Sequence, residues 1–154
     1  MIASSTGAKI SIGPVSANTT AAAFAALAFT EIGSIDQLPS FGAKNNIVKF
    51  VPLNTGVMEK RKGSADYGDP ALTVFHDATD PGQQAALAAY ADQLNAYAFK
   101  VEIPDASSNT GTDSVFYFNA FVVSAQLQVG AIDQPVKRVL ELAITGDVVE
   151  VPGT

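Results

Sequence analysis

The single histidine, His76, is the first residue to test for chemistry, because an imidazole titrates near neutral pH and serves as a base or metal ligand. It follows Leu72 and Val74 on one face of a predicted strand, ALTVFHD. A catalytic base needs a nucleophile and an orienting acid beside it, and the sequence places neither. The absence of cysteine excludes disulfides, thiolate metal sites and cysteine nucleophiles. We therefore expect His76 to have a structural environment.

Four aspartates, Asp66, Asp69, Asp77 and Asp80, gather near predicted turns and raise the question of a calcium site. They lack the alternating Asp/Asn ligands and the closing glutamate of an EF-hand loop. Turn formation and helix capping account for them. The chain also has no phosphate loop, nucleophile elbow or dinucleotide fingerprint. The sequence predicts no enzyme activity, no metal and no cofactor.

The charge balance restricts the partners. Fifteen acidic and nine basic residues give a net charge of −6, which disfavours binding to nucleic acid or to anionic membranes. No apolar run approaches the ~20 residues of a membrane span. Charged residues make up 16% of the chain, below the usual quarter, so we expect copies of the chain to cover part of its surface.

Three of the nine basic residues, Lys60, Arg61 and Lys62, are adjacent in a segment predicted to form a loop tip. They are explained either by a solvated loop or by docking onto an acidic surface of another copy, where opposite charge would set the orientation.

One helix is predicted at about residues 81–95. Asp80 is a favourable N-cap, Pro81 suits the first helical position, and Gln83 has the spacing of a capping box. The apolar stripe predicted to pack on a sheet consists of Leu87, Tyr90, Ala91 and Leu94.

The rest of the chain predicts strands, at residues 25–35, 46–53, 71–77, 96–103, 114–130 and 136–145. The predicted fold is mainly β: an antiparallel β-sandwich or barrel of about seven strands with one flanking α-helix. Residues 1–154 are expected to form a single domain. Residues 1–20 are expected to be an extended N-terminal arm that is ordered only against a partner. Residues 42–68 are expected to be a long loop or hairpin arm.

The longest predicted strand, residues 114–130, changes character along its length. Its even-numbered face begins apolar with Phe116 and Phe118 and becomes polar at Ser124, Gln126 and Gln128. Such a strand is expected to be buried on both sides at one end and to be solvated on one side at the other.

The order of several segments resembles a known family. EIGSID, LPSFG, a charged loop, GSADYGDPALTVFHDATDPGQQAAL and YAFKVEIPD precede a long strand and a closing hairpin. This series resembles the major tail tube protein of long-tailed, lambda-like bacteriophages over about residues 25–148. DPGQQAAL, between its two flanking strands, is the most characteristic piece.

The resemblance implies a protomer of hexameric rings that stack into a hollow tube, assembled around a tape-measure protein. Tail terminator and distal tail proteins would be further partners, and DNA would pass through without specific binding. The protein would be assembled in the bacterial host cytoplasm and located in the virion tail. Residues 42–68, with Lys60, Arg61 and Lys62, would reach the adjacent ring, and Ser124, Gln126 and Gln128 would be a possible lumen face.

Three alternatives remain open at the level of sequence. A type VI secretion tube protein is similar in fold to the family and shares its ring geometry. A small β-barrel ligand-binding protein or enzyme that uses His76 would be a stable monomer with a pocket. A head-decoration or adhesin-like module would form trimers instead of tubes.

Overall fold

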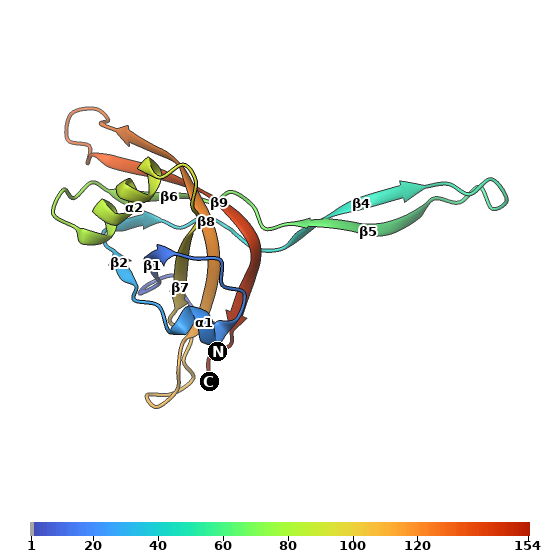
Figure 1. Cartoon of the computed structure of the whole chain (residues 1–154), viewed down its shortest axis with the longest axis horizontal. Coiled ribbons are helices and arrows are strands. Elements are labelled where there is room, and N and C mark those ends of the chain that lie inside the picture. Colours follow the sequence, from blue (N-terminus) through green and yellow to red (C-terminus); the bar gives the residue numbers. More distant parts are fainter. Residues whose placement is uncertain (1) are drawn as a thin grey trace.

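The computed structural model describes residues 2–154 and consists mainly of antiparallel strands (Figure 1). Seven of them form one antiparallel sheet in the order β2-β1-β7-β8-β9-β6-β3. Their bounds are β1 (Lys9–Val15), β2 (Thr30–Ile32), β3 (Ile35–Gln37), β6 (Ala71–Phe75), β7 (Tyr97–Ile103), β8 (Ser114–Gln128) and β9 (Lys137–Val151). Strands β4 (Lys44–Phe50) and β5 (Glu59–Asp66) form a separate hairpin, and the helices are α1 (Ala21–Ala25) and α2 (Pro81–Ala91). The predicted fold class is confirmed.

The sheet curls until its two outermost strands meet. Strands β2 and β3 lie at opposite ends of the strand order, yet only Gly33 and Ser34 separate them along the chain. The carboxylate of Asp80 accepts a hydrogen bond from the Gly33 N–H at 2.9 Å, and the Ser34 carbonyl accepts one from the Phe75 N–H at 2.8 Å. These contacts fix the short link between the two outer strands, residues 33–34, against α2 and β6, so that the sheet curls into a barrel; we call this link the seam.

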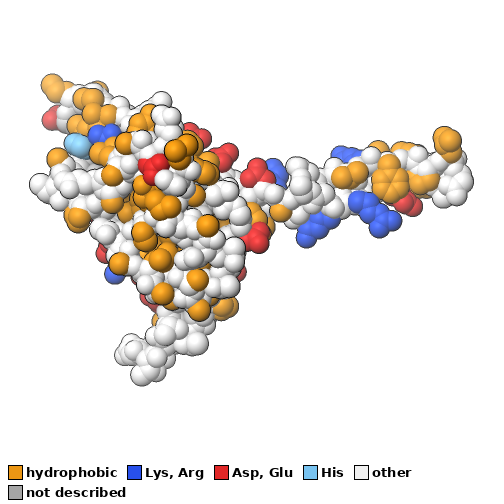
Figure 2. Space-filling model, viewed as in Figure 1, with side chains coloured by type: hydrophobic (Ala, Val, Ile, Leu, Met, Phe, Trp, Pro, Cys, Tyr) orange, Lys and Arg blue, Asp and Glu red, His pale blue; other side chains and the backbone are white. Residues whose placement is uncertain are grey.

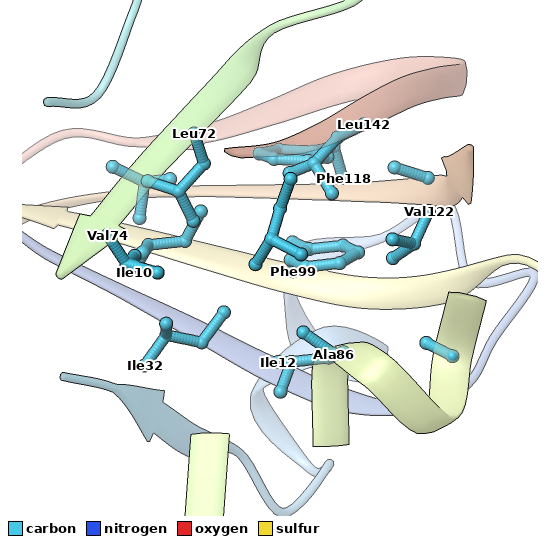
Figure 3. Close-up of a cluster of buried hydrophobic side chains, with 14 residues drawn as sticks. Ile10, Ile12, Ile32, Leu72, Val74, Ala86, Phe99, Phe118, Val122 and Leu142 are labelled. Carbon is cyan, nitrogen blue, oxygen red and sulfur yellow. The ribbon is translucent and has the colours of Figure 1, made fainter. Parts of the chain in front are cut away.

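The interior of the barrel holds the main hydrophobic core (Figure 3). Alternate residues of each strand point inward, as the pleat of a strand requires. The rings of Phe99 and Phe118 stack in its centre with centroids 5.6 Å apart, and Ala86 and Ala89 of α2 close one side. Each large apolar side chain buried in this way contributes roughly 1.5–3 kcal/mol, so the core accounts for most of the stabilisation of the barrel.

A smaller cluster lies on the other face of the sheet, under α1. The ring of Phe24 is fully buried and stacks on Tyr117 at 5.4 Å, and Thr20 caps the helix by accepting a hydrogen bond from the Ala23 N–H. Burial on both sides explains why the first half of β8 is apolar on both faces. The sequence prediction of one strand over residues 25–35 is wrong, because the alanine-rich run around Phe24 favours a helical turn and β2 begins only at Thr30.

The N-terminal segment also differs from expectation. Residues 1–20 were expected to form an extended arm, but β1 lies inside the sheet between β2 and β7, with Ile10 and Ile12 buried. Ile10 pairs with Ile32 on one side and Val101 on the other. The alternation of Ile10 and Ile12 was visible in the sequence, but the distant strand that β1 pairs with was not.

Helix α2 ends at Ala91, and its inward face is not the predicted one. Leu87 is half-buried, Ala91 is exposed, and Tyr90 and Leu94 are 48% and 87% exposed. The residues that face the sheet are instead the small ones, namely Gly82, Ala86 and Ala89, together with Gln83. Gly82 lies so close to the backbone of Glu31 and Ile32 that a Cβ atom has no room there. Close approach of the helix to β2 therefore selects small residues and turns the large apolar ones outward.

Gln83 does not complete a capping box. Asp80 is the N-cap, and its carboxylate accepts a hydrogen bond from the Gln83 N–H at 3.2 Å. The buried Gln83 amide instead donates to the carbonyls of Gly33 and Phe75 and accepts from the Asp77 N–H. It therefore joins α2, β6 and the seam. In the part of the chain that the structure describes, neither helix is long and apolar enough to span a membrane.

Candidate assembly surfaces

The hairpin of β4 and β5, residues 44–66, projects away from the barrel as an arm (Figure 1). It carries five basic and two acidic residues, a net charge of +3, while the rest of the chain carries four and thirteen, a net charge of −9. Figure 2 shows the Lys and Arg side chains grouped along the arm. The molecule is therefore strongly bipolar, and charge alone favours contact between the arm of one copy and the barrel of another.

The strand register divides the arm into two faces. Lys49 lies opposite Lys60, and Ile47 lies opposite Lys62, so these four residues share one face, which we call the lysine face. The other face, which we call the mixed face, carries Val48, Phe50, Glu59 and Arg61. Like charges directly opposite each other destabilise a strand pair, so the lysine face is not optimised for the isolated hairpin.

This register corrects the predicted loop tip. Lys60, Arg61 and Lys62 lie within β5 instead of at the tip, and successive side chains of a strand alternate in direction. Arg61 therefore points away from Lys60 and Lys62. A role for these residues in contact between rings stays a prediction.

The true tip of the arm, residues 51–58, is apolar. Val51, Leu53, Val57 and Met58 are 51%, 104%, 65% and 54% exposed. The turn is closed by a hydrogen bond from the Gly56 N–H to the Pro52 carbonyl at 2.9 Å. Such a group of exposed apolar side chains at a projecting loop is typical of a binding surface. The sequence offered this signal in VPLNTGVM, which is apolar where turns are usually polar.

At the base of the arm, the backbone and one tyrosine connect the hairpin to the barrel. The Gly42 N–H donates to the Tyr67 carbonyl at 3.1 Å, and the Asp66 carboxylate accepts from the Gly68 N–H. Interaction with the Asp147 carboxylate of β9 raises the pKa of the Tyr67 phenol. The Tyr67 side chain therefore lies beside β9 at the base of the arm.

The polar end of β8 lies on one face of the sheet because of a bulge. Pairing shifts between Val122 and Ser124, after which Ser124, Gln126 and Gln128 lie opposite Glu141, Val139 and Lys137. Ala125 lies opposite the buried Leu140 and continues the core face, so the three polar residues point to the other side. Ser124 is half-buried and the two glutamines are exposed. Whether this surface lines a lumen stays a prediction.

An open pocket of about 400 Å³ lies between the end of α2 and β8. Tyr90, Ala91, Phe121, Val122 and Val123 supply apolar walls, and Asp92 and Gln93 complete the lining. Tyr90 and Val123 are about half exposed, at 48% and 50%. This surface exists because the large apolar residues of α2 point outward. The predicted packing stripe placed Tyr90 and Ala91 against the sheet instead.

Asp92 gives this pocket a fixed negative charge. Its carboxylate accepts hydrogen bonds from the Asn95 amide at 2.9 Å, the Leu94 N–H at 3.1 Å and the Tyr97 hydroxyl at 3.0 Å. The bond from Asn95, followed by that from Leu94, lowers the pKa of Asp92. Burial, and then the bond to Asp92, raise the pKa of Tyr97. The carboxylate is therefore ionised at neutral pH and held in place.

The residues considered as catalytic or metal-binding candidates take part in turns, a helix cap and backbone hydrogen bonds. His76 is exposed on the segment after β6, and its backbone N–H donates to the Val136 carbonyl. Asp77 accepts from the N–H and hydroxyl of Thr79. Asp66 closes a turn, and Asp80 caps α2. Within residues 2–154, no group of three or more His, Cys, Asp or Glu side chains is placed to hold a metal ion.

Another pocket, of about 690 Å³, is lined by residues 5–8, 35–41 and 103. Its one acidic residue, Asp36, forms an ion pair with Lys137 at 2.9 Å.

No protein-family model matches the chain, and no curated protein matches its sequence. Solved structures do match. The chain is similar to a sheath/tube terminator (PVC) of an extracellular contractile injection system, with a TM-score of 0.67, 11% identity and coverage of 94% of this chain and 92% of that one. It is similar to the SPP1 tail tube, with a TM-score of 0.64, 14% identity and coverage of 94% and 76%. It is also similar to a chain from the tail of an empty GTA particle, with a TM-score of 0.63, 14% identity and coverage of 97% and 99%.

The chain has a tail-tube-like fold. The similar structures include components of contractile systems as well as the SPP1 tail tube, so they support this fold without singling out lambda-like phages. At 11–14% identity, the similarity is one of fold.

Proposed function

We propose that the chain is a structural, non-enzymatic protomer of a phage-type tail tube, in which copies form rings and the rings stack into a hollow tube. The observation that carries the proposal is the tail-tube-like fold, which extends over 94% to 97% of the chain in the SPP1 and GTA comparisons. The series of sequence segments that resembles the tail tube proteins of long-tailed phages points in the same direction.

The proposed rings are hexamers. Two of the similar structures are described with six-fold symmetry, a contractile baseplate (AFP) and the GTA tail. A contact repeated around a rotation axis closes a ring, and a contact repeated along that axis gives an open-ended tube. One protomer therefore needs two different head-to-tail contacts, each of which joins two different surfaces of the chain.

The arm is the proposed contact between rings. Its charge of +3 is opposite in sign to the charge of −9 on the rest of the chain. Lys60 and Lys62 on the lysine face, with Arg61 on the mixed face, would orient the arm on the acidic surface of the adjacent ring.

The lumen is proposed to include Ser124, Gln126 and Gln128. These neutral polar side chains, on a net-negative protein, would let DNA pass without binding, because phosphates are bound by positive charge. The tape-measure, tail terminator and distal tail proteins are the proposed partners. The proposed location is the virion tail, after assembly in the cytoplasm of the bacterial host.

A second candidate is a terminator ring, which closes the end of a tube. It is supported by the similarity to the PVC sheath/tube terminator and to the AFP tube-terminating cap. A terminator would form rings that do not stack on one another.

Electron microscopy of the purified protein, with its mass from light scattering over a range of concentrations, tests the proposal. Stacked rings or hollow tubes are the expected result. Single rings at every concentration would favour the terminator. A protein that stays monomeric even after tail proteins are added would contradict both candidates.

A further inference from the structure

The apolar tip of the arm and the pocket beside Tyr90 are complementary in chemistry. The tip presents Val51, Leu53, Val57 and Met58, all more than half exposed. The pocket presents Tyr90, Phe121 and Val123 among its walls. Both expose apolar surface to water, and burial of such surface is favourable by roughly 25 cal/mol per Å².

The tip and the pocket lie at opposite ends of the molecule. Along the longest axis, the tip of the β4–β5 arm is at one extreme, and α2 lies near the other (Figure 1). The tip therefore cannot enter the pocket of its own chain. A contact between two such separated surfaces joins copies head to tail and leaves a free tip and a free pocket on every assembly that does not close.

The arm and the pocket also carry opposite charges beside their apolar surfaces. Lys49 and Lys60 form the second pair of the hairpin counted from the tip, next to the terminal pair of Phe50 and Glu59. Asp92 lies in the pocket lining as a carboxylate held by three hydrogen bonds. An arm that enters tip first brings its lysine face toward this carboxylate and relieves the repulsion between Lys49 and Lys60.

We infer that the apolar tip of the arm, residues 51–58, docks into the pocket formed by Tyr90, Phe121 and Val123 of a second copy of this chain. The inference rests on the proposed function, because it names the surface that receives the arm. In this contact the tip supplies the buried apolar area, and the lysine face supplies the orientation. The exposed apolar residues of α2 are then part of the assembly surface.

Cysteine cross-linking tests this contact directly, because the natural chain has no cysteine. Asn54→Cys places a thiol at the tip without removing an apolar side chain, and Gln93→Cys places one at the exposed rim of the pocket. When the two single variants are mixed and mildly oxidised, we expect a covalent dimer that reduction reverses. A chain that carries both cysteines is expected to give a ladder of higher oligomers.

Two controls define the specificity. Ser108→Cys, on an exposed loop away from the pocket, is expected to give no dimer with Asn54→Cys. Leu53→Ser in the Asn54→Cys chain is expected to abolish the dimer, whereas Ile2→Ser, which removes an equally exposed apolar side chain, is expected to leave it unchanged.

The same samples are examined by electron microscopy, so that two failures can be told apart. Rings or tubes without the tip-to-pocket dimer would overturn the docking site and leave the tube proposal standing. Dimers formed mainly between two Asn54→Cys chains would overturn it as well, because the tips would then meet each other. Absence of both particles and dimers at every concentration would overturn the docking site and count against the tube proposal.

Discussion

The barrel and the arm use the same residue types for opposite purposes. In the barrel, Phe99 is fully buried and stacks on Phe118, whereas Phe50 in the arm is 40% exposed. In the barrel, Lys100 and Glu102 form an ion pair at 2.7 Å. In the arm, Lys49 is paired across the hairpin with Lys60. In these two pairs, the barrel residues have their partners within the chain, whereas the arm residues are exposed.

This difference has a thermodynamic meaning. A two-stranded hairpin without a third strand or a core is marginally stable at best in water. The arm also lacks a partner for its apolar tip and its lysine face. Its sequence is therefore better suited to a complex than to the free protomer, and folding and assembly should respond to different substitutions.

The largest expected difference between the barrel and the arm comes from a matched pair of phenylalanine truncations. Phe99→Ala is expected to lower the free energy of unfolding by about 3–5 kcal/mol, because it leaves a cavity in the core. Phe50→Ala is expected to change it by less than about 0.5 kcal/mol, as for other exposed positions. Urea unfolding of both variants measures the difference. Equal losses would mean that the arm belongs to the folding unit.

A second pair compares adjacent glutamines on α2. Gln83→Ala leaves the Asp77 N–H and the carbonyls of Gly33 and Phe75 without their buried partner, and is expected to cost about 1–3 kcal/mol or more. Gln84→Ala removes an exposed hydrogen bond to the Ala78 carbonyl and is expected to cost less than about 0.5 kcal/mol. Thermal and urea unfolding test both. A neutral Gln83→Ala would mean that Gln83 does not hold the seam.

Local patterns explain how much of the fold the sequence predicted. Strands β6, β7 and β8 and the start of α2 were predicted because alternation, a proline and an N-cap are short-range signals. Strand β1 was missed because its neighbours, β2 and β7, are distant in sequence. Helix α1 was missed because it is only five residues long, too short for an apolar period to identify it.

The assembly surfaces were harder to predict, for two physical reasons. The inward face of α2 is set by how closely Gly82 approaches β2, which a hydrophobic stripe does not record. The basic triplet was treated as one patch, but it lies in a strand whose alternation sends Arg61 away from its neighbours. Ser124, Gln126 and Gln128 do share one face, but the bulge before Ser124, which the sequence did not reveal, puts that face opposite to the one of Phe116 and Phe118.

A smaller effect is expected from pH, and it belongs to the barrel. Hydrogen bonds from the hydroxyl and N–H of Ser114 lower the pKa of Asp105, and a bond from Asn95 lowers that of Asp92. A carboxyl with a lowered folded-state pKa stabilises the fold above its ordinary value of 3.8, and this contribution is lost as pH falls through 3.8 toward the folded-state pKa. The melting temperature should therefore decrease in this acidic range.

Asp105→Asn identifies one source of that decrease, because asparagine does not titrate. The variant is expected to be less stable at neutral pH and to lose less stability on acidification than the natural chain. An unchanged pH profile would show that Asp105 has the same pKa in the folded and unfolded states.

The smallest effect on folding, and the clearest on assembly, is expected from charge reversal in the arm. Reversal of Lys60, Arg61 and Lys62 together is expected to leave the free energy of unfolding within about 0.5 kcal/mol, because these side chains are exposed, and to block stacking. Reversal of Lys60 and Lys62 alone should do the same, whereas Arg61→Glu, on the mixed face, should have a smaller effect on stacking.

Electron microscopy and sedimentation at two salt concentrations measure stacking, because screening by salt should weaken stacking of the natural chain. Normal tubes from the triple variant would show that the arm does not orient neighbouring rings by charge. If reversal of Lys60 and Lys62 weakens stacking less than Arg61→Glu does, the mixed face makes the contact.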